Sequence, residues 1–529
     1  MSLRRCLLVV SLVLPLTAVP PATSEPDPGG SRAVVAKVDA VQQGFSPLHA
    51  TRGANPGIFN ARGARVLLHG VNVNGLAEYY AARPDLPTTI PVRRDDFRRI
   101  ARVGFNSVRL LVSWSRLEPR PGAYNTTYVE RVKRAVRQAA SFGLYVVIDM
   151  HQDAWGPGVF TPEGETCLPG ASRANGWDGA PLWATRTDGL PTCRFGAREL
   201  SPAVAAAWQH FYDNDRGIQT HLVRTWGRLA ADFAAMRSVA GFDLLNEPNA
   251  GLLPGVADTA ALGAFYDSAI RAIRKGESSR PGGFHHIVFF EPGILWSALG
   301  IYPTVLPSFT DDTNIVFAPH IYAESISPNS IETGFQNAAD VAKLYGVTVW
   351  SGEYGFFSSK PDQDADKLDR YGAAEDAHLF GGAWWSWKQA CGDPHVTHEP
   401  GGQPDPVSPS LVRYGCPGDH AAARIAPAYR EVLSRPMLRA VPGRVNRFVS
   451  NGRQGTLTLA GVHTRGADRC GLRIFVPQRW AQHQIRTTGI RGLHSTTSLG
   501  NVDFRGCVDD LFTFRLLRET PRRDGLGRN

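Results

Sequence analysis

The sequence predicts an α/β chain in which a (β/α)8 barrel (a TIM barrel) precedes a small C-terminal β-sandwich. Eight short apolar runs alternate with stretches of helical periodicity, which is typical of a parallel sheet covered on both faces. Near Ser434 the pattern changes, and prolines replace long helical periodicity. The composition, 43% apolar and 20% charged, is that of a folded globular protein.

The barrel strands are expected in a regular series. They are Val66–Val73, Asn106–Ser113, Leu144–Met150, Gly241–Asn246, His285–Glu291, Asn314–His320, Val347–Glu353 and Gly381–Trp387. Helical patterns between them include Arg93–Val103, Val129–Phe142, Thr259–Lys275 and Ile331–Leu344. A doubly wound open sheet is the alternative, but it would carry a Gly-rich phosphate turn, and Leu68–Gly75 does not match GxGxxG. The barrel, predicted over residues 46–433, is therefore favoured.

The region 434–520 is predicted to form the sandwich. Its expected strands are Arg444–Ser450, Gly455–Val462, Gly471–Pro477, Ile485–Thr488 and Leu511–Leu517. An accessory, substrate-positioning role and a purely structural role both stay open for this domain. The polar residues 521–529 are expected to form a disordered tail.

The N-terminus resembles an export signal over residues 1–24. Arg4 and Arg5 precede an apolar run from Cys6 to Leu16, which is shorter than the ~20 residues of a membrane-spanning helix. A Pro-, Gly- and Ser-rich linker is expected at 25–45. We therefore predict a soluble protein that is secreted after the signal peptide is cleaved.

Six cysteines remain once Cys6 leaves with the signal. In an exported chain they predict three disulfides, for which 15 connectivities are possible. The local pairing is favoured: Cys167 with Cys193, Cys391 with Cys416, and Cys470 with Cys507. No CxxC spacing is present, so we predict no metal and no other cofactor.

The formal charge of +9 comes mainly from scattered arginines. Without a long basic run or a basic patch interleaved with aromatic residues, nucleic acid is excluded as an expected partner. The excess charge still allows peripheral contact with a membrane or micelle surface. We expect a monomer.

Polar residues recur where the predicted strands end, and the carboxyl ends of barrel strands carry active sites. These candidates are Arg109, His151, Asp153, Asn246, Glu247, His320, Tyr322, Glu353, Trp385 and Lys388. Taken singly, each is more often a packed, ion-paired or loop residue than a functional one. Their convergence on one barrel mouth favours a site.

Two of these residues, Glu247 and Glu353, are carboxylates suited to retaining glycoside hydrolysis, in which the carboxyl groups lie about 5–5.5 Å apart. Glu247 is the predicted acid/base, with a pKa raised by burial and by its neighbour's charge. Glu353 is the predicted nucleophile, kept ionised by Arg109 and by a hydrogen bond from Tyr322.

The sugar is expected to meet further residues of this set. Asn246 is predicted to hold the 2-hydroxyl, an interaction that strengthens in the transition state. Trp385 is predicted to form the floor under the sugar ring.

The set Arg109, His151, Asn246-Glu247-Pro248, His320-Ile-Tyr322, Glu353 and Trp385 resembles glycoside hydrolase family five. Within it, the stretches Asp149–Trp155, Trp350–Gly355 and Trp385–Lys388 are similar to endoglycoceramidases, as is a β-sandwich after the barrel. Endoglycoceramidases cut between an intact oligosaccharide and the ceramide of a glycosphingolipid. The resemblance implies a glycolipid substrate, with His151, Asp153 and Lys388 on the hydroxyls of the sugar next to the cleaved bond.

One departure leaves the sugar open. Some members of the subgroup carry a sugar-contacting Lys after strand one, whereas this chain has Asn72–Glu78 without lysine. Glucose and galactose head groups are therefore both possible. An endo-β-glucanase, a steryl β-glucosidase and a non-catalytic carbohydrate- or lipid-binding barrel are the alternatives.

Two loops bear on the aglycone. The apolar stretch Pro292–Leu306 could line a lipid groove or fold onto its own core. The insertion Asp153–Leu200, with Trp155, Trp177 and Trp183, could supply another wall.

Overall fold

A computed structural model describes residues 41–518, apart from 303, 358–359, 405–409, 414–415 and 417–423. The predicted signal peptide (1–24), most of the predicted linker (25–45) and the predicted tail (521–529) lie outside the described residues. Among the helices that are described, none combines the length and the apolarity needed to cross a membrane.

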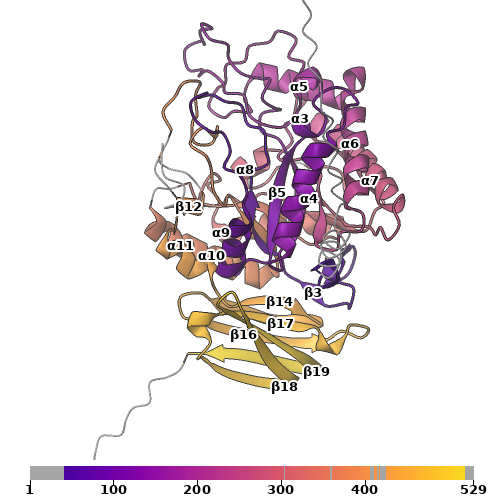
Figure 1. The fold of residues 1–529 in the computed structure, drawn as a ribbon, viewed down its shortest axis with the longest axis vertical. Coiled ribbons are helices and arrows are strands. Elements are labelled where there is room, and N and C mark those ends of the chain that lie inside the picture. Colours follow the sequence, from indigo (N-terminus) through magenta and orange to yellow (C-terminus); the bar gives the residue numbers. More distant parts are fainter. Residues whose placement is uncertain are drawn as a thin grey trace, which may run out of the picture. The chain divides into compact units, whose positions relative to one another are not determined.

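Eight parallel strands form the barrel, and each of the eight predicted runs contains one of them (Figure 1). They are β4 (His69–Val73), β5 (Ser107–Ser113), β6 (Tyr145–His151), β7 (Val239–Asp243), β8 (Ile287–Phe290), β9 (Ile315–Phe317), β10 (Trp350–Tyr354) and β11 (Gly381–Trp384). Strand β11 pairs with β4 in register Ala383 to Gly70. The last gap, between β9 and β10, is spanned by the single bridge from Phe317 to Val349.

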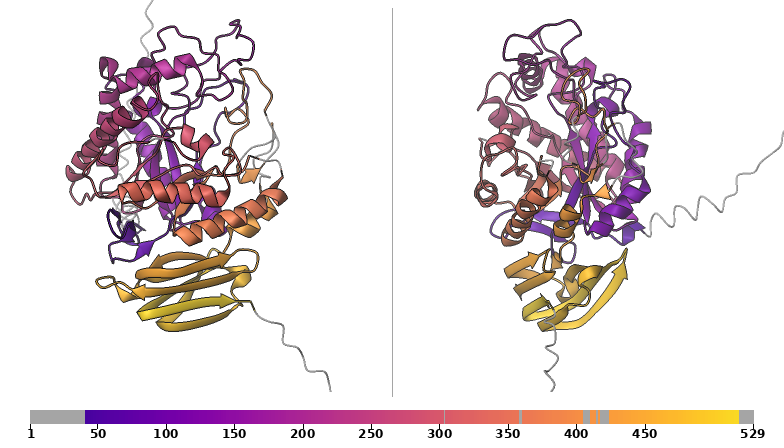
Figure 2. Two further views of the ribbon diagram at one scale, coloured as in Figure 1. Left: turned by 180° about the vertical axis from the view of Figure 1, so that it is seen from behind. Right: turned by 90° about the vertical axis from the view of Figure 1, so that its left-hand side faces the viewer.

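Helices surround the strands (Figures 1 and 2). The principal ones are α2 (Arg94–Val103), α4 (Thr126–Ala140), α5 (Pro202–Tyr212), α6 (Ile218–Phe233), α7 (Leu262–Ser278), α9 (Ile331–Tyr345) and α10 (Pro361–His378). Helix α9 illustrates why they begin and end where they do. The Ser330 side chain accepts the Thr333 N–H at its start, and Gly346 takes a left-handed conformation at its end.

The interior of the barrel has two layers of different chemistry. Near the amino ends of the strands, apolar side chains such as Val147, Phe289 and Trp350 pack into one cluster. Farther along, the inward positions carry charges, among them Arg109, which is fully buried. Because alternate residues of a strand face the same side, this second layer gathers polar groups from several strands at one level.

The C-terminal part is an antiparallel sheet around a separate apolar core, which confirms the predicted sandwich region. Its strands are β14 (Met437–Val441), β15 (Gly443–Asn451), β16 (Thr456–His463), β17 (Leu472–Pro477), β18 (Gln484–Ser498) and β19 (Asn501–Leu517). Strand β19 pairs with β17 through its first half and with β16 through its second. One long strand therefore contributes to both layers.

Three short N-terminal strands join this same sheet. They are β1 (Leu48–Thr51), β2 (Gly57–Asn60) and β3 (Arg65–Val66), and β3 pairs with β14. The predicted strand Val66–Val73 is thus two strands, because the chain leaves the antiparallel sheet at Val66 and enters the barrel at His69. The predicted domain boundary at residues 433–434 stays a prediction.

The three predicted disulfides are confirmed. Cys167 bonds to Cys193, Cys391 to Cys416 and Cys470 to Cys507. The first closes the insertion after β6, and the last ties the turn before β17 to β19.

Candidate active site

Glu247 and Glu353 approach each other at the carboxyl ends of β7 and β10. Both are buried, and their nearest carboxylate oxygens lie within 4.8 Å of each other. His320 lies between them, with Nδ1 2.7 Å from Glu247 Oε1 and 3.4 Å from Glu353 Oε2. The separation suits direct attack by one carboxylate, since inverting sites hold the two groups about 6.5–9.5 Å apart to admit a water.

The backbone at Glu247 is strained, with a φ of 39° in the left-handed region. Its N–H donates to Glu291 Oε2 at 2.8 Å, which holds the residue in this conformation. Strain of this kind costs on the order of 1–3 kcal/mol and persists only where the surroundings impose it. The turn directs the Glu247 carboxylate toward His320.

Arg109 on β5 holds the acidic residues beneath the site. Its guanidinium bonds Glu353 Oε1 at 2.8 Å and Glu291 Oε1 at 2.7 Å. It also lies 2.8 Å from Asp243 Oδ2 and 3.0 Å from Asp149 Oδ1. A single cation among four buried carboxylates cannot neutralise them all, so protons or further cations must share the balance.

Three donors surround the Glu247 carboxylate. Ser297 Oγ donates to Oε1, His320 Nδ1 contacts the same oxygen, and Arg198 Nη2 lies 3.3 Å from Oε2. Burial alone would raise the pKa of Glu247, but the positive charges of His320 and Arg198 outweigh it and lower the pKa below its ordinary value. The predicted rise in the pKa of Glu247 is therefore wrong for the free site.

Glu353 makes both contacts predicted for it. Arg109 bonds one oxygen, and the Tyr322 hydroxyl donates to the other at 2.8 Å. Burial nevertheless raises the pKa of Glu353, and the charge of Glu247 adds to this effect against the opposing cations His320 and Arg109. In the free site a shared proton therefore favours Glu353 over Glu247.

A cavity of about 540 Å³ opens above the two carboxylates. Besides the pair, eight residues are predicted to bind the substrate, and four of them line the cavity: His151, Asp153, Tyr322 and Trp385. The rings of His151 and Trp385 stack at 5.3 Å, so they form one surface. Asp149 fixes that imidazole by accepting its Nδ1 at 2.7 Å.

Lys388, which is also predicted to contact the sugar, is not among the described lining residues of the cavity. Its Nζ contacts Asp96 Oδ2 at 2.7 Å, and the Trp387 indole donates to the same carboxylate. This buried acid at the start of α2 holds Lys388 away from the mouth. The predicted contact of Lys388 with the sugar is therefore wrong. Arg109, Asn246 and His320 are buried and are not among the described lining residues, so the contact of Asn246 with the sugar 2-hydroxyl stays a prediction.

Asn246 bridges the two levels of the site. Its Oδ1 accepts from Arg109 Nη2 at 3.0 Å, and its Nδ2 donates to the Gln152 carbonyl at 2.9 Å. The amide is thus fixed in one orientation, with its second N–H still able to donate.

Five further residues belong to the site but were not predicted from the sequence: Arg198, Ser297, Glu291, Asp149 and Asp243. The three acids carried a recognisable indication, because each ends or interrupts an apolar run that must be buried. Arg198 and Ser297 carried none, since Arg198 lies on a loop and Ser297 on the short helix α8 (Leu295–Leu299), and the positions of both depend on tertiary packing.

Arg198 is the most connected of these. It pairs with Asp153, Glu199 and Glu247, and its guanidinium lies 4.4 Å from the centre of the Trp177 ring. The insertion therefore places a cation directly beside the predicted acid/base.

The outer wall of the cavity is apolar. Leu295 and Ala298 come from the short helix after β8 and Ile294 from the residue that precedes it, whereas Ile326 and Phe357 come from later loops. Ile326 is 50% exposed and Phe357 39% exposed. In the stretch Pro292–Leu306 both interpretations hold in part: some side chains are buried, whereas others are exposed at the rim.

Of the three tryptophans in the insertion, Trp177 lines the cavity. Trp155 packs instead on Trp114 and Trp208 in the barrel core.

This chain matches the family model described as Cellulase (glycosyl hydrolase family 5) over residues 60–390. The chain belongs to glycosyl hydrolase family 5. It is therefore a glycoside hydrolase.

Known relatives place it more narrowly. A solved endogalactoceramidase structure is 41% identical, with a TM-score of 0.81, and the match covers 89% of this chain and 100% of that one. Endoglycoceramidase I of Rhodococcus hoagii is 29% identical over 52% of this chain and 54% of that relative. Endoglycoceramidase of Hydra vulgaris is 27% identical over 47% of this chain and 50% of that relative.

The match thus spans about half the length of these two curated relatives. The chain belongs to the endoglycoceramidase-like branch of the family.

Proposed function

We propose that this glycoside hydrolase cleaves the bond between the glycan and the ceramide of glycosphingolipids, with retention of anomeric configuration. The observation that carries the proposal is the pair Glu247 and Glu353, whose oxygens lie within 4.8 Å at the floor of a cavity with an apolar outer wall. A retaining mechanism needs this proximity, and a lipid aglycone needs this wall.

In the first step Glu353 attacks the anomeric carbon, and the bond from that carbon to the ceramide oxygen breaks. Glu247 donates its proton to the leaving oxygen. In the second step Glu247 takes a proton from water, and the resulting hydroxide displaces Glu353 from the sugar. Tyr322 and Arg109 hold the Glu353 carboxylate in line, since each bonds one of its oxygens.

The cycle requires the proton to reach Glu247 before bond cleavage. In the free site Arg198 and His320 hold Glu247 as a carboxylate. A leaving group that enters beside Glu247 displaces Arg198 toward Asp153 and Glu199, its other partners. Loss of this cation raises the pKa of Glu247 and prepares it as the acid.

The sugar occupies the polar end of the cavity. Trp385 forms its floor, and His151 and Asp153 meet its hydroxyls, because these groups line the cavity on the side of the two carboxylates. The free N–H of Asn246 binds the 2-hydroxyl.

The ceramide lies against the apolar loops. Leu200, Ile326 and Phe357 line the cavity and are partly exposed, so acyl chains would cover apolar surface that otherwise contacts water. An open polysaccharide cleft would not need such a wall, which disfavours an endo-β-glucanase. A steryl β-glucosidase stays the second candidate, since a sterol is also apolar.

Galactose is the head group we propose. The solved relative that shares 41% identity is an endogalactoceramidase, and this chain lacks a lysine in Asn72–Glu78. We also propose secretion, to which the three disulfides lend support because they persist in oxidising compartments.

The test is incubation of the enzyme with galactosyl-headed and glucosyl-headed glycosphingolipids, a cellulose-type polymer and a steryl glucoside. We expect intact glycan and free ceramide from the galactosyl substrate, and proton NMR to detect the β-anomer first. Cleavage of only the polymer or only the sterol would overturn the lipid proposal. An α-anomer as first product would overturn retention.

A further inference from the structure

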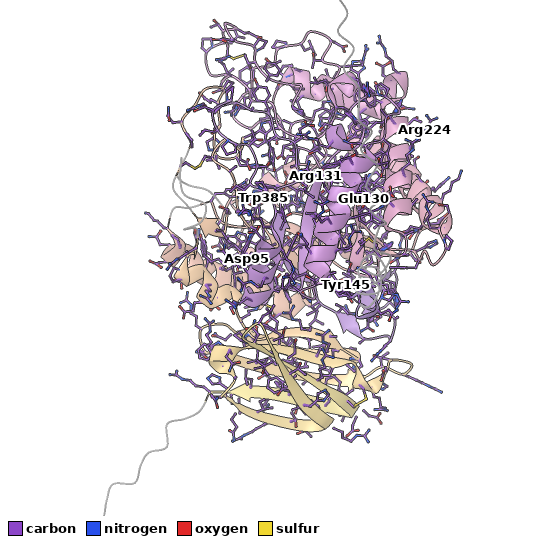
Figure 3. All side chains as sticks on the ribbon, viewed as in Figure 1. Asp95, Glu130, Arg131, Tyr145, Arg224 and Trp385 are labelled. Carbon is purple, nitrogen blue, oxygen red and sulfur yellow. A yellow bond between two sulfur atoms is a disulfide. The ribbon has the colours of Figure 1, made fainter. Side chains whose placement is uncertain are left out.

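A second large cavity lies at the other end of the barrel, where it meets the C-terminal sheet. Its volume is about 510 Å³. Phe105 and Asn106 before β5, Tyr145 at the start of β6 and Arg237 before β7 form its barrel side. Figure 3 labels Tyr145 near the C-terminal sheet and Trp385, on the lining of the catalytic cavity, farther from it. The second cavity is therefore separate from the candidate active site.

Its described lining is strongly basic. Five arginines contribute to it, namely Arg62, Arg237, Arg439, Arg473 and Arg505, whereas Asp503 is the one acidic residue of the lining. Asp503 lies 3.9 Å from Arg473, a loose pairing. A concave surface with this excess of like charge concentrates anions.

Arg439 is the buried member of this group. It lies on β14, is 8% exposed, and stacks over the Phe475 ring at 4.6 Å. Its Nη2 donates to the Gly104 carbonyl, whereas its Nη1 has no hydrogen-bond partner among the described residues. A buried charged donor without an acceptor is costly, so this atom indicates a ligand with acceptor oxygens.

Neighbouring charges act on the same cations. Burial lowers the pKa of Arg439, Asp503 opposes this shift and Arg473 adds to it, which together bring the pKa to about 10. The pKa of Arg505 is lowered by burial and then by Arg473, again against Asp503. Arg473 therefore repels both Arg439 and Arg505, and an anion bound among these guanidiniums would relieve that repulsion.

From this geometry we propose that the cavity between the barrel and the C-terminal sheet binds a tetrahedral oxyanion of the phosphate or sulfate class. Guanidinium groups suit such anions because their planar forks present paired N–H donors to two oxygens at once. Arg439 supplies the buried donor, and Arg473 and Arg505 supply donors from the sheet. The oxyanion could be free or belong to a phospholipid head group.

Titration of the full chain with inorganic phosphate tests the site. Calorimetry at constant ionic strength, with chloride as the balancing ion, should give saturable binding to one site. Arg473→Gln and Arg505→Gln should each weaken this binding about tenfold, because each removes a charge-assisted donor. Arg486→Gln is the matched control, since Arg486 is an exposed arginine on β18 outside the lining.

Thermal unfolding provides a second measurement. Phosphate should raise the Tm of the wild type and the Arg486→Gln variant, and raise it less in the two cavity variants. Because Arg439 is buried, its Gln variant tests folding as well as binding, so the conclusion rests on the two exposed arginines.

Vesicles distinguish the two sources of the oxyanion. The wild-type protein is tested for flotation with phosphatidylglycerol vesicles. A lipid head group is identified if the wild type floats with the vesicles, Arg473→Gln does not, and added phosphate prevents flotation of the wild type. Phosphate binding without flotation would identify a free oxyanion. Unsaturable phosphate binding, or equal affinity in wild type and both cavity variants, would overturn the proposal.

Discussion

Two large cavities in the described part of the molecule use arginine in opposite ways. At the barrel mouth, Arg109 contacts four carboxylates, and Arg198 pairs with Asp153, Glu199 and Glu247. At the barrel base, three arginines share Asp503. Each arginine of the mouth thus has several acidic partners, which suits a neutral sugar, whereas the described lining of the base has one acidic residue for five arginines, which suits an anion.

The difference also explains how each cavity is held. Arg109 is fully buried and bonds several carboxylates, so its position is fixed before substrate arrives. Arg473 and Arg505 are exposed and loosely paired, so the base gains order when a ligand binds.

The largest effect is expected at the mouth. Glu353→Gln should lower kcat on the order of 10^4-fold or more, because the amide cannot form the glycosyl-enzyme. Initial rates on a galactosyl-headed lipid measure this loss. Glu332→Gln, an exposed glutamate paired with Arg370, is the matched control and should retain full activity. Normal turnover by Glu353→Gln would show that another residue is the nucleophile.

Arg109→Met should cost about 3–5 kcal/mol of stability, because it leaves the buried carboxylates without their shared cation. Urea unfolding at pH 7 measures the change. Arg370→Met, which removes a surface ion pair, should cost about 1 kcal/mol or less. Equal losses of stability in the two variants would show that Arg109 contributes no more to folding than a surface ion pair does.

Arg198→Gln should change the pH dependence of kcat/KM. Glu247 must carry its proton to act as the acid, so activity falls as the pH rises through its pKa. Removing the Arg198 charge raises that pKa, and the basic limb should move up by about one pH unit. Arg173→Gln, on the same insertion but outside the cavity lining, should leave the limb in place. If the basic limb of Arg198→Gln stayed at the wild-type pH, Arg198 would not control the protonation of Glu247.

The smallest effect is expected at the base. In chloride buffer Arg473→Gln should stabilise the fold by a few tenths of a kcal/mol, since it relieves repulsion between partly exposed charges. Thermal unfolding at low ionic strength measures it, with Arg486→Gln as reference. If Arg473→Gln were less stable than the wild type in chloride, the arginines of the base would already have enough negative partners, and the two cavities would not differ in this way.

Much of the fold follows from local pattern. The eight apolar runs predicted the barrel strands because a strand buried on both faces must be apolar throughout, and this held even where Asp149 and Glu291 interrupt the pattern. The split at Val66 was not predictable, because Arg65–Val66 pairs with residues distant in sequence. Strands β18 and β19 were expected to be shorter, since their exposed middle segments lack a clear apolar alternation.

At the site, residues on strands were easier to predict than residues on loops. Glu247 and Glu353 follow directly from strand ends, and the structure brings them together. The prediction for Lys388 was wrong because its side chain pairs with Asp96, and the sequence around either residue does not indicate that pairing. The predicted rise in the pKa of Glu247 was wrong because the shift depends in part on Arg198, which lies on a long insertion after β6.

The pairing of β3 with β14 sets an order on how the protein is made. A ribosome releases β3 before any barrel strand, but its partner emerges only after the whole barrel. Until then β3 presents an unpaired strand edge, which favours contact with other chains. The earliest and latest parts of the chain must therefore meet before the nascent protein is safe from aggregation, and truncation at the end of the barrel would leave that edge open for good.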